Sequence, residues 1–368
     1  MKTYKQKIAI VGGGIFGTTC ALILGKRFSV TLFERRSDIL QEASWANQYR
    51  HHMGYHYPRS PETIMEIKAA DKDFLSIYRR TVVYDYPSYY CIAKDGSRTS
   101  AEQFLRLCKK FNLPHRKEYP PPELLDPKTV EICIRTPEAI YDYKKLKQLV
   151  KEKIKKNRSI KLNLDSRIIN ANISKNGQKI LTIKRGRELR REAFDYVINA
   201  TYANYNEFCG WLGLPKKNLE YRLKEIIVIK LKTKQDYAVF IADGPFATIV
   251  PTGQKNIFTF GDAPLSVHEI RGQKTPVLSM EKKLKTLKSR WPKMQKRCVK
   301  WMPAIQKAQY LYSMFVILPI ETSTKSMDAR PTDVVCHGNG CWSILSGKII
   351  TCVSVAKKIL QEIQLLHK

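Results

Sequence analysis

Three glycines and an acidic residue near the start of the chain have the types and spacing of a dinucleotide site. The pattern Gly-x-Gly-x-x-Gly spans residues 12–17, directly after the apolar segment 7–11, and Glu34 follows a second apolar segment at 29–33. In a strand–turn–helix unit of this kind, the first glycine permits a tight turn and the second lets the backbone approach a pyrophosphate. The helix that follows offers free N–H groups to the phosphates, and Glu34 can accept hydrogen bonds from ribose hydroxyls. The segment therefore predicts that the chain binds a dinucleotide.

The residues after Glu34 leave the kind of dinucleotide open. Arg35 and Arg36 are able to meet a 2′-phosphate, so NADP is an alternative to a cofactor without that group. A tight turn in an unrelated α/β protein is the structural alternative, but it does not explain an acid at the end of the second strand.

A second group of reactive side chains lies between residues 44 and 60, a segment with neither helical nor strand periodicity. The segment is aromatic and basic, and His51, His52 and His56 lie close together in it. Imidazole changes its protonation near neutral pH, so His52 and His56 are predicted to act as a base on a hydroxyl or an amine. The alternative is that each histidine is a polar residue with an ordinary structural partner.

Arginines provide candidate sites for an anionic substrate group. Arg330 precedes Pro331, and its planar guanidinium suits bidentate contact with a carboxylate or a phosphate. Arg50 and Arg59 are the second choices, and a surface turn is the structural alternative for Arg330.

The nine cysteines are scattered, odd in number and without a Cys-x-x-Cys pair. This pattern argues against a disulfide framework and against a zinc site, so no metal is predicted, and it is typical of a reducing cytoplasm. The chain has no apolar run of the roughly 18 to 20 residues that span a bilayer, and no apolar signal core follows its first lysines. We therefore expect a cytoplasmic protein.

The formal net charge of +32 is the most unusual global property of this chain of 368 residues. Dense basic stretches occur at 151–161, 185–191 and 282–300. Solvated surfaces of a lysine-rich protein explain them, and the alternatives are a weak contact with an anionic membrane or with nucleic acid. A membrane contact would be peripheral, at the inner face.

The elements that position these residues follow from apolar periodicity. Strands are predicted at 7–11, 29–33, 82–93, 160–164, 168–173, 179–184, 196–199, 224–232, 238–241, 247–250, 257–261 and 334–336. Helices are predicted at 18–26, 61–74, 103–111, 138–154, 280–291 and from 346 to about 366, with a cap at 99–102 and a stop at Pro292. Strands followed by glycine turns and helices occur at both ends of the chain, so both ends are expected to share one sheet.

This order of elements predicts an α/β fold, in which a Rossmann-like dinucleotide-binding domain is interrupted by a substrate domain with an antiparallel sheet (α+β). The predicted parts of the first domain are 1–82, 138–215 and 326–368. The predicted parts of the substrate domain are 83–137 and 216–325.

Several segments carry a resemblance to a known family. They are the glycine turn with Glu34, His-x-Gly-x-x-Tyr at 52–57, the segment 196–201, residues 328–331, and residues 346–349. With them the chain resembles, over nearly its full length, the FAD-dependent D-amino-acid-oxidase-like oxidoreductases. This superfamily includes glycine oxidase, L-2-hydroxyglutarate oxidase and flavin-linked glycerol-3-phosphate dehydrogenase.

The resemblance implies an FAD-dependent oxidoreductase that oxidises a small amino acid, amine or 2-hydroxy acid by hydride transfer to the flavin, with oxygen or quinone as electron acceptor. It implies that His52 and His56 provide the base and that Arg330 holds the substrate. Lys348 would stabilise the negative charge of the reduced flavin, and an ordinary lysine at a helix start is its alternative. The implied cofactor-binding residues are Gly12, Gly14, Ile15, Phe16, Gly17, Glu34, Arg35, Asn47, Gln48, His51, Ala200, Thr201, Gly338, Gly340, Gly347, Lys348 and Ile349.

Other functions stay open beside this one. A flavoprotein of this fold could act on a polyanion such as modified tRNA, or serve as a peripheral membrane dehydrogenase that feeds quinone. One of the histidines could carry the flavin covalently. A non-catalytic FAD- or NAD-binding protein is a further alternative, because Tyr202 takes a position that the resembling family usually fills with glycine in an Ala-x-Gly turn.

Overall fold

A six-stranded sheet takes strands from both ends of the chain, in a computed structural model that describes residues 6–322 and 332–366. Its order is β20 (Asp333–Cys336), β21 (Cys341–Leu345), β13 (Tyr196–Asn199), β1 (Lys7–Val11), β2 (Ser29–Phe33) and β9 (Ile160–Asn163). All neighbouring pairs are parallel except β20 with β21. The carboxyl ends of five strands therefore meet at one edge, and the expectation that both chain ends share a sheet is confirmed.

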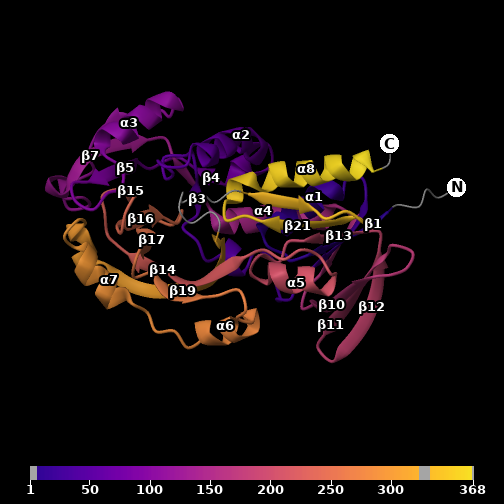
Figure 1. The fold of residues 1–368 in the computed structure, drawn as a ribbon. Helices are drawn as coiled ribbons and strands as arrows, with labels where there is room; N and C mark the ends of the chain where they lie inside the picture. Colours follow the sequence, from indigo (N-terminus) through magenta and orange to yellow (C-terminus); the bar gives the residue numbers. More distant parts are fainter. Residues whose placement is uncertain (1–5, 323–331, 367–368) are drawn as a thin grey trace.

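The two faces of this sheet are covered by different elements because side chains alternate along a strand. Ile8 and Ile10 of β1 belong to a core formed with the helices α1 (Ile15–Leu24), α2 (Pro61–Tyr78), α4 (Tyr143–Lys156) and α8 (Cys352–Leu365). Figure 1 shows α8 lying beside α1 along this face. Ala9 and Val11 point the other way.

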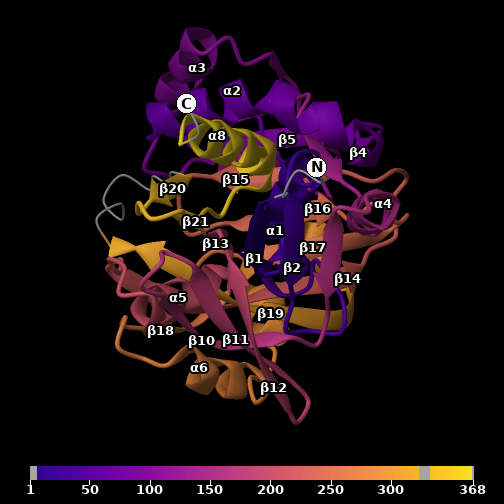
Figure 2. The same ribbon diagram turned by 90° about the vertical axis from the view of Figure 1, so that its right-hand side faces the viewer.

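The opposite face is covered by a three-stranded antiparallel sheet and a short helix. The sheet contains β10 (Arg167–Ile173), β11 (Lys179–Arg185) and β12 (Glu188–Phe194), and the helix is α5 (Tyr205–Trp211). Ala9 and Val11 pack here against Ile168, Leu181 and Phe208. The basic residues at 185–191 lie at and after the turn between β11 and β12, which Figure 2 shows projecting from the molecule.

A second, larger sheet forms the other half of the molecule (Figure 1). Its order is β18 (Val267–Arg271), β14 (Leu219–Lys230), β17 (Ile257–Asp262), β16 (Ala247–Pro251), β15 (Ala238–Ala242), β5 (Ser88–Ala93), β7 (Val130–Thr136) and β6 (Arg116–Lys117), with β19 (Gln309–Glu321) on the other edge of β14. Its strand pairs are antiparallel apart from β15 with β5. The predicted fold class is confirmed, and the domain boundaries stay a prediction.

A small sheet of β3 (Arg50–His51), β8 (Ala139–Tyr141) and β4 (Val82–Val83) lies beside the two large ones. The remaining helices are α3 (Ala101–Lys110), α6 (Val277–Leu284) and α7 (Trp291–Cys298). Ser100 caps α3 by accepting the N–H of Gln103, whose side chain bonds back to the Ser100 N–H, so the capping box begins one residue later than predicted.

Three predicted elements are wrong. The helix predicted at 138–154 begins only at Tyr143, because Ile140 belongs to β8 and pairs with Arg50. The helix predicted at 280–291 is two helices, and Pro292 opens α7 instead of ending a helix, since a proline is well accommodated in a first turn. The strand predicted at 82–93 is split into β4 and β5.

In the described part of the chain, we find no helix with the length and apolar character needed to cross a membrane.

Candidate functional site

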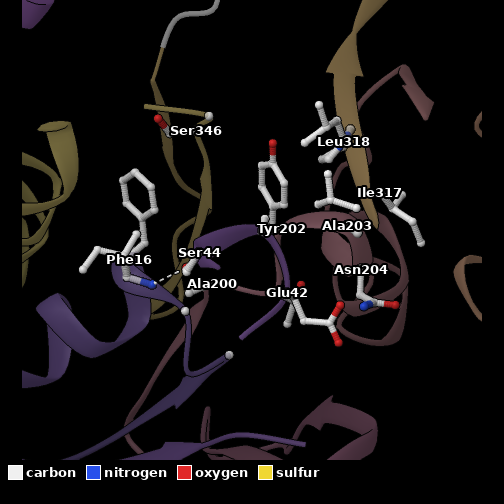
Figure 3. A pocket seen from close by; sticks show the side chains of 18 of the residues that line it. Phe16, Glu42, Ser44, Ala200, Tyr202, Ala203, Asn204, Ile317, Leu318 and Ser346 are labelled. Atoms are coloured by element: carbon white, nitrogen blue, oxygen red, sulfur yellow. Dashed lines mark hydrogen bonds between the residues drawn. The ribbon is translucent and has the colours of Figure 1, made fainter. Parts of the chain in front are cut away.

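The main cavity lies at the carboxyl edge of the parallel sheet. The ends of four strands contribute to its wall, with Gly12 after β1, Glu34 after β2, Ala200 after β13 and Ser346 after β21. Its other wall comes from β14 and β19 of the large sheet and contains Ile226, Val316 and Leu318. Figure 3 shows Ser346, Ala200 and Phe16 on one side and Ile317 and Leu318 on the other. Ligands of open α/β sheets bind at this edge.

Two glycines of the turn are required by close packing. Gly12 has φ +109°, and a Cβ on it would lie 2.5 Å from the carbonyl oxygen of Ala200. A Cβ on Gly17 would lie 1.9 Å from the carbonyl oxygen of Gly12, so a glycine at this position lets α1 pack closely against the end of β1. Gly17 is therefore needed for the packing of α1 against the turn, and it does not line the cavity.

Gly14 is different, because a Cβ there would meet only the Ser44 hydroxyl oxygen, at 3.3 Å, and would otherwise project into free space. Gly14 lines the cavity and is the N-cap of α1, but it has no side chain with which to cap the helix. Ser44 supplies the missing group, since its hydroxyl accepts the N–H of Ile15 at 3.0 Å. This glycine leaves the start of α1 open for a ligand.

Glu34 is held in place by backbone groups. Its Oε2 accepts the N–H of Gly13 at 2.7 Å, and its Oε1 accepts the N–H of Arg36 at 2.8 Å. Burial raises the pKa of Glu34 above its usual value, although both N–H groups favour the charged form. The carboxylate thus lies fixed in the cavity wall, as the ribose-binding prediction requires.

The two arginines after Glu34 already have acidic partners. Arg35 lies 2.5 Å from Glu281 of α6 and 3.4 Å from Glu42, and Arg36 Nε donates to Glu42 at 2.6 Å. These carboxylates neutralise both guanidinium groups, which disfavours the NADP alternative. The open start of α1 and the fixed carboxylate of Glu34 together fit the adenosine and diphosphate parts of a dinucleotide such as FAD.

His52 and His56 line the same cavity, with their ring centroids 6.0 Å apart. Burial lowers the pKa of His52 well below its usual value of 6.5, and the positive charges of Arg50 and Lys348 act in the same direction. The imidazole of His52 is therefore neutral at physiological pH and can accept a proton.

His51 does not reach the cavity, so its predicted contact with the cofactor is corrected. Neighbouring residues of β3 point to opposite sides, and it is Arg50 that lines the cavity. The ring of His51 packs against Phe74, and its Nε2 lies 2.8 Å from an oxygen of Asp71.

Gly338 and Gly340 are also corrected. They lie in the turn between β20 and β21, at the amino end of β21, whereas the cavity lies at its carboxyl end. A Cβ on Gly340 would be 3.0 Å from the carbonyl oxygen of Asp195, which precedes β13 at the same distant edge. Sequence motifs cannot show at which end of a strand a glycine turn will fall when the strand itself is not predicted.

Most of the predicted residues line the cavity, and Lys348 and Arg330 stand apart from them. Those that line the cavity are Gly12, Gly14, Ile15, Phe16, Glu34, Arg35, Asn47, Gln48, His52, His56, Ala200, Thr201, Gly347 and Ile349. The side chain of Lys348 is buried and leads away from the cavity toward α2, where its Nζ lies 2.8 Å from Glu66. Arg330 lies outside the described residues.

Tyr202 is a lining residue that sequence reasoning did not place in the site. It has φ +54°, a left-handed conformation that favours glycine, and its hydroxyl would lie 3.7 Å from a Cβ on Gly347. Figure 3 shows its ring between Ser346 on one side and Leu318 on the other. The signal in the sequence was the departure from the expected glycine. Glu138 and Tyr90, which contact Arg50 behind the cavity wall, carry no such signal.

The family model described as FAD dependent oxidoreductase matches residues 7–347. The FAD-dependent monooxygenase FPY4 of Fusarium mangiferae is 23% identical over 372 residues, which cover 96% of this chain and 90% of that protein. The FAD-dependent monooxygenase kojA of Aspergillus flavus is 35% identical over 108 residues, which cover 28% of this chain and 25% of that protein.

Solved structures share the fold. Glycine oxidase from Geobacillus kaustophilus matches with a TM-score of 0.72 at 14% identity, over 98% of this chain and 95% of that one. L-alpha-glycerophosphate oxidase from Mycoplasma pneumoniae, a structure with FAD bound, matches with a TM-score of 0.70 at 14% identity, over 98% of this chain and 94% of that one.

Proposed function

The chain belongs to the FAD dependent oxidoreductase family, and on this basis we propose that it oxidises a small amino acid, amine or 2-hydroxy acid by hydride transfer to the flavin. The observation that carries the choice of substrate is the neutral, half-buried imidazole of His52 in the same cavity as the glycine turn. Oxidation at a carbon that bears a hydroxyl or an amine releases a proton as well as a hydride, and in this proposal His52 takes the proton.

The residues of the chain have separable tasks in this proposal. Gly14 and the start of α1 hold the diphosphate, and Glu34 holds the ribose. FAD, when bound, accepts the hydride. His52 accepts the substrate proton, with His56 beside it. The apolar side chains of β14 and β19 exclude water from the reacting groups, namely Ile226, Val316 and Leu318.

Two residues stay as proposals for charge stabilisation. We propose Arg330 as the clamp for a carboxylate or phosphate of the substrate, on the chemistry of its guanidinium. For Lys348, the ion pair of its buried ammonium with the partly exposed Glu66 supports an electrostatic contribution rather than direct contact, since its positive charge lowers the pKa of His52.

Anaerobic titration of the FAD-loaded protein tests the proposal. D- and L-amino acids, amines and 2-hydroxy acids are added in turn, and bleaching of the oxidised-flavin absorption is followed. We expect one class to reduce the flavin. His52→Gln should retain FAD but reduce about 100-fold more slowly or worse, as expected for loss of a general base. Bound FAD that no class reduces would contradict the substrate assignment.

A second proposal concerns the electron acceptor and its location. Exposed lysines lie along α4, and they support a weak contact with an anionic membrane, where quinone would be the acceptor instead of oxygen. They are Lys144, Lys145, Lys151, Lys153, Lys155 and Lys156. Retention on anionic vesicles at physiological salt, together with quinone reduction, is the expected result. Equal retention on tRNA would favour a polyanion instead, and loss of both near 0.1 M salt would leave only bulk charge.

A further inference from the structure

A buried ion pair lies at the cavity wall that carries His52, where Arg50 lines the cavity and Glu138 lies behind it. Nε and Nη2 of Arg50 in β3 donate to Glu138 Oε1 at 3.2 and 2.9 Å. The Tyr90 hydroxyl of β5 donates to the same oxygen at 2.6 Å and also contacts the guanidinium. The side chains of Arg50 and Glu138 are only 5% and 1% exposed. Such a pair is costly to desolvate, so its position calls for an explanation beyond stability.

The guanidinium of Arg50 is fixed on its other side as well. Its central carbon lies 4.0 Å from the centroid of the Phe240 ring, a cation–π contact. Arg50 of β3 therefore contacts Tyr90 of β5 and Phe240 of β15, and these three strands meet beside Glu138, which lies between β7 and β8. The carboxylate cannot move without disturbing all three.

The second oxygen of Glu138 reaches the chain next to His52. Oε2 accepts the N–H of Met53 at 3.0 Å, and Oε1 lies 3.9 Å from Nδ1 of His52. Among the described residues, this Nδ1 is buried and has no hydrogen-bond partner. The carboxylate thus fixes the backbone immediately after His52 and also lies near Nδ1 of the His52 ring.

We propose that Glu138 is the positioning residue for His52, in support of the proposed oxidation. It orients the ring with Nδ1–H toward the carboxylate and Nε2 toward the cavity, and it stabilises the imidazolium formed during turnover. In that step the O–H or N–H bond of the substrate and the C–H bond of the adjoining carbon break, and a C=O or C=N bond forms between the two atoms. The proton forms an N–H bond at Nε2, and bound FAD would take up the hydride. Glu138 does not touch the substrate.

The charges around His52 show why a carboxylate is needed there. The groups that lower its pKa, after burial itself, are Arg50, His56, Lys348 and His51. The ring of Tyr57 also packs against it, with centroids 5.6 Å apart, and Glu66 balances Lys348 from α2. An imidazolium at His52 faces this excess of positive charge, so a nearby anion determines whether a proton can be accepted during the reaction.

Nitrogen NMR on the FAD-loaded protein with isotopically labelled histidine tests the proposal without a substrate. The chain has seven histidines, and His52→Gln identifies the signals of His52. We expect a neutral ring protonated at Nδ1. Glu138→Gln keeps the size of the side chain and one acceptor oxygen, which can serve Arg50 and Tyr90 or the Met53 N–H but not both, and it loses the charge. In this variant the pKa of His52 should fall further and its tautomer should become mixed. Unchanged signals of His52 would overturn the proposal.

The matched control is a second buried carboxylate beside a histidine. Glu225 of β14 lies 2.8 Å from His268 Nε2, and neither residue lines the cavity. Glu225→Gln should change the signals of His268 and leave those of His52 unchanged. A change of His52 in this variant as well would mean that any buried carboxylate loss disturbs the ring, and the proposal would fail.

A second variant covers the case in which Glu138→Gln does not fold. Tyr90→Phe keeps the ion pair and removes one donor that competes with His52 for Oε1. The pKa of His52 should then rise, and an unchanged or lower value would overturn the proposal. The flavin reduction rate of Glu138→Gln with a reducing substrate should fall about tenfold or more, as for other residues that orient a functional histidine. If no substrate reduces the flavin, the NMR result stands, and only the proposed function fails.

Discussion

The two halves of the cavity are built from different parts of the polypeptide. The dinucleotide half is formed mainly by backbone groups, namely a glycine with φ +109°, an open helix start, and N–H groups that hold Glu34. In the half that carries His52, side chains from three strands fix one another around a buried ion pair. A site built from backbone leaves a short motif in the sequence, whereas one built from distant side chains does not.

The difference predicts which half is more sensitive to the loss of a side chain. Arg50→Met removes one partner of the buried pair and leaves Glu138 uncompensated. We expect the free energy of unfolding to fall by about 3 to 5 kcal/mol, measured by urea denaturation. Arg50→Met combined with Glu138→Gln should recover much of that loss, because no unpaired charge remains.

An exposed ion pair of the same chemistry is the control for this variant. Arg106 pairs with Glu102 on α3, and their side chains are 64% and 76% exposed. Arg106→Met should change the free energy of unfolding by less than about 1 kcal/mol. Equal effects of Arg50→Met and Arg106→Met would show that burial does not distinguish the two pairs, and the contrast between the halves would be lost.

Adding a side chain should have its large effect, a loss of FAD affinity, in the dinucleotide half of the cavity. Gly14→Val places a branched side chain in the space left for the diphosphate, and the backbone there (φ −70°, ψ −178°) accepts any residue. FAD affinity should fall at least about 100-fold, or about 3 kcal/mol, while the protein stays folded. Fluorescence titration with FAD and circular dichroism measure the two properties.

Gly272→Val is the matched control for the glycine variant. Gly272 is exposed, and a Cβ on it would meet nothing within 4 Å. This variant should bind FAD as the parent protein does. If Gly14→Val also kept its FAD, the start of α1 would not be the diphosphate site.

Removing a side chain from the dinucleotide half should lower the free energy of unfolding less than Arg50→Met does. Ser44→Ala removes the hydroxyl that accepts the Ile15 N–H at 3.0 Å. The cost should be about 1 kcal/mol in the free energy of unfolding, the usual value for a lost helix cap. Ser76→Ala, where an exposed hydroxyl donates to the carbonyl oxygen of Asp73 in its own helix, should stay within about 0.5 kcal/mol of the parent. A loss at Ser44 as large as that at Arg50 would contradict the contrast.

The same contrast explains how much of the molecule could be predicted from the sequence. The glycine turn, Glu34, the strand at 196–199 and the family resemblance all rest on local patterns, and the fold class and the FAD dependence follow from them. Strand β21, with the sequence Cys-Trp-Ser-Ile-Leu, has no alternation because it is buried on both faces, and it was missed. Without it, Gly338 and Gly340 were assigned to the wrong end of the sheet.

Glu138 shows why the second half could not be predicted. Its neighbours Ile140 and Leu146 have helical spacing, which placed it at the start of a helix. Ile140 instead pairs with Arg50, from a segment far away in the chain, and that pairing brings the carboxylate behind His52. Long-range strand pairing of this kind has no signature in the spacing of nearby residues.

The smallest expected effect is that of pH on the flavin reduction rate, which should hardly change near neutral pH. The folded protein lowers the pKa of His52 well below 6.5, mainly by burial and then by Arg50 and other positive neighbours. A base with a lowered pKa loses its function only when the pH falls through that lowered value, so the neutral form persists across neutral pH. With a 2-hydroxy acid as substrate, the flavin reduction rate should change by less than about twofold between pH 6.5 and 8, in stopped-flow measurements. Arg50→Met, where it folds, removes one of those charges and should move the acidic fall of the rate to higher pH, whereas Arg106→Met should leave it in place. A parent rate that falls steeply near pH 6.5 would mean that His52 titrates like an exposed histidine, and that the buried pair does not govern the chemistry of its half of the cavity.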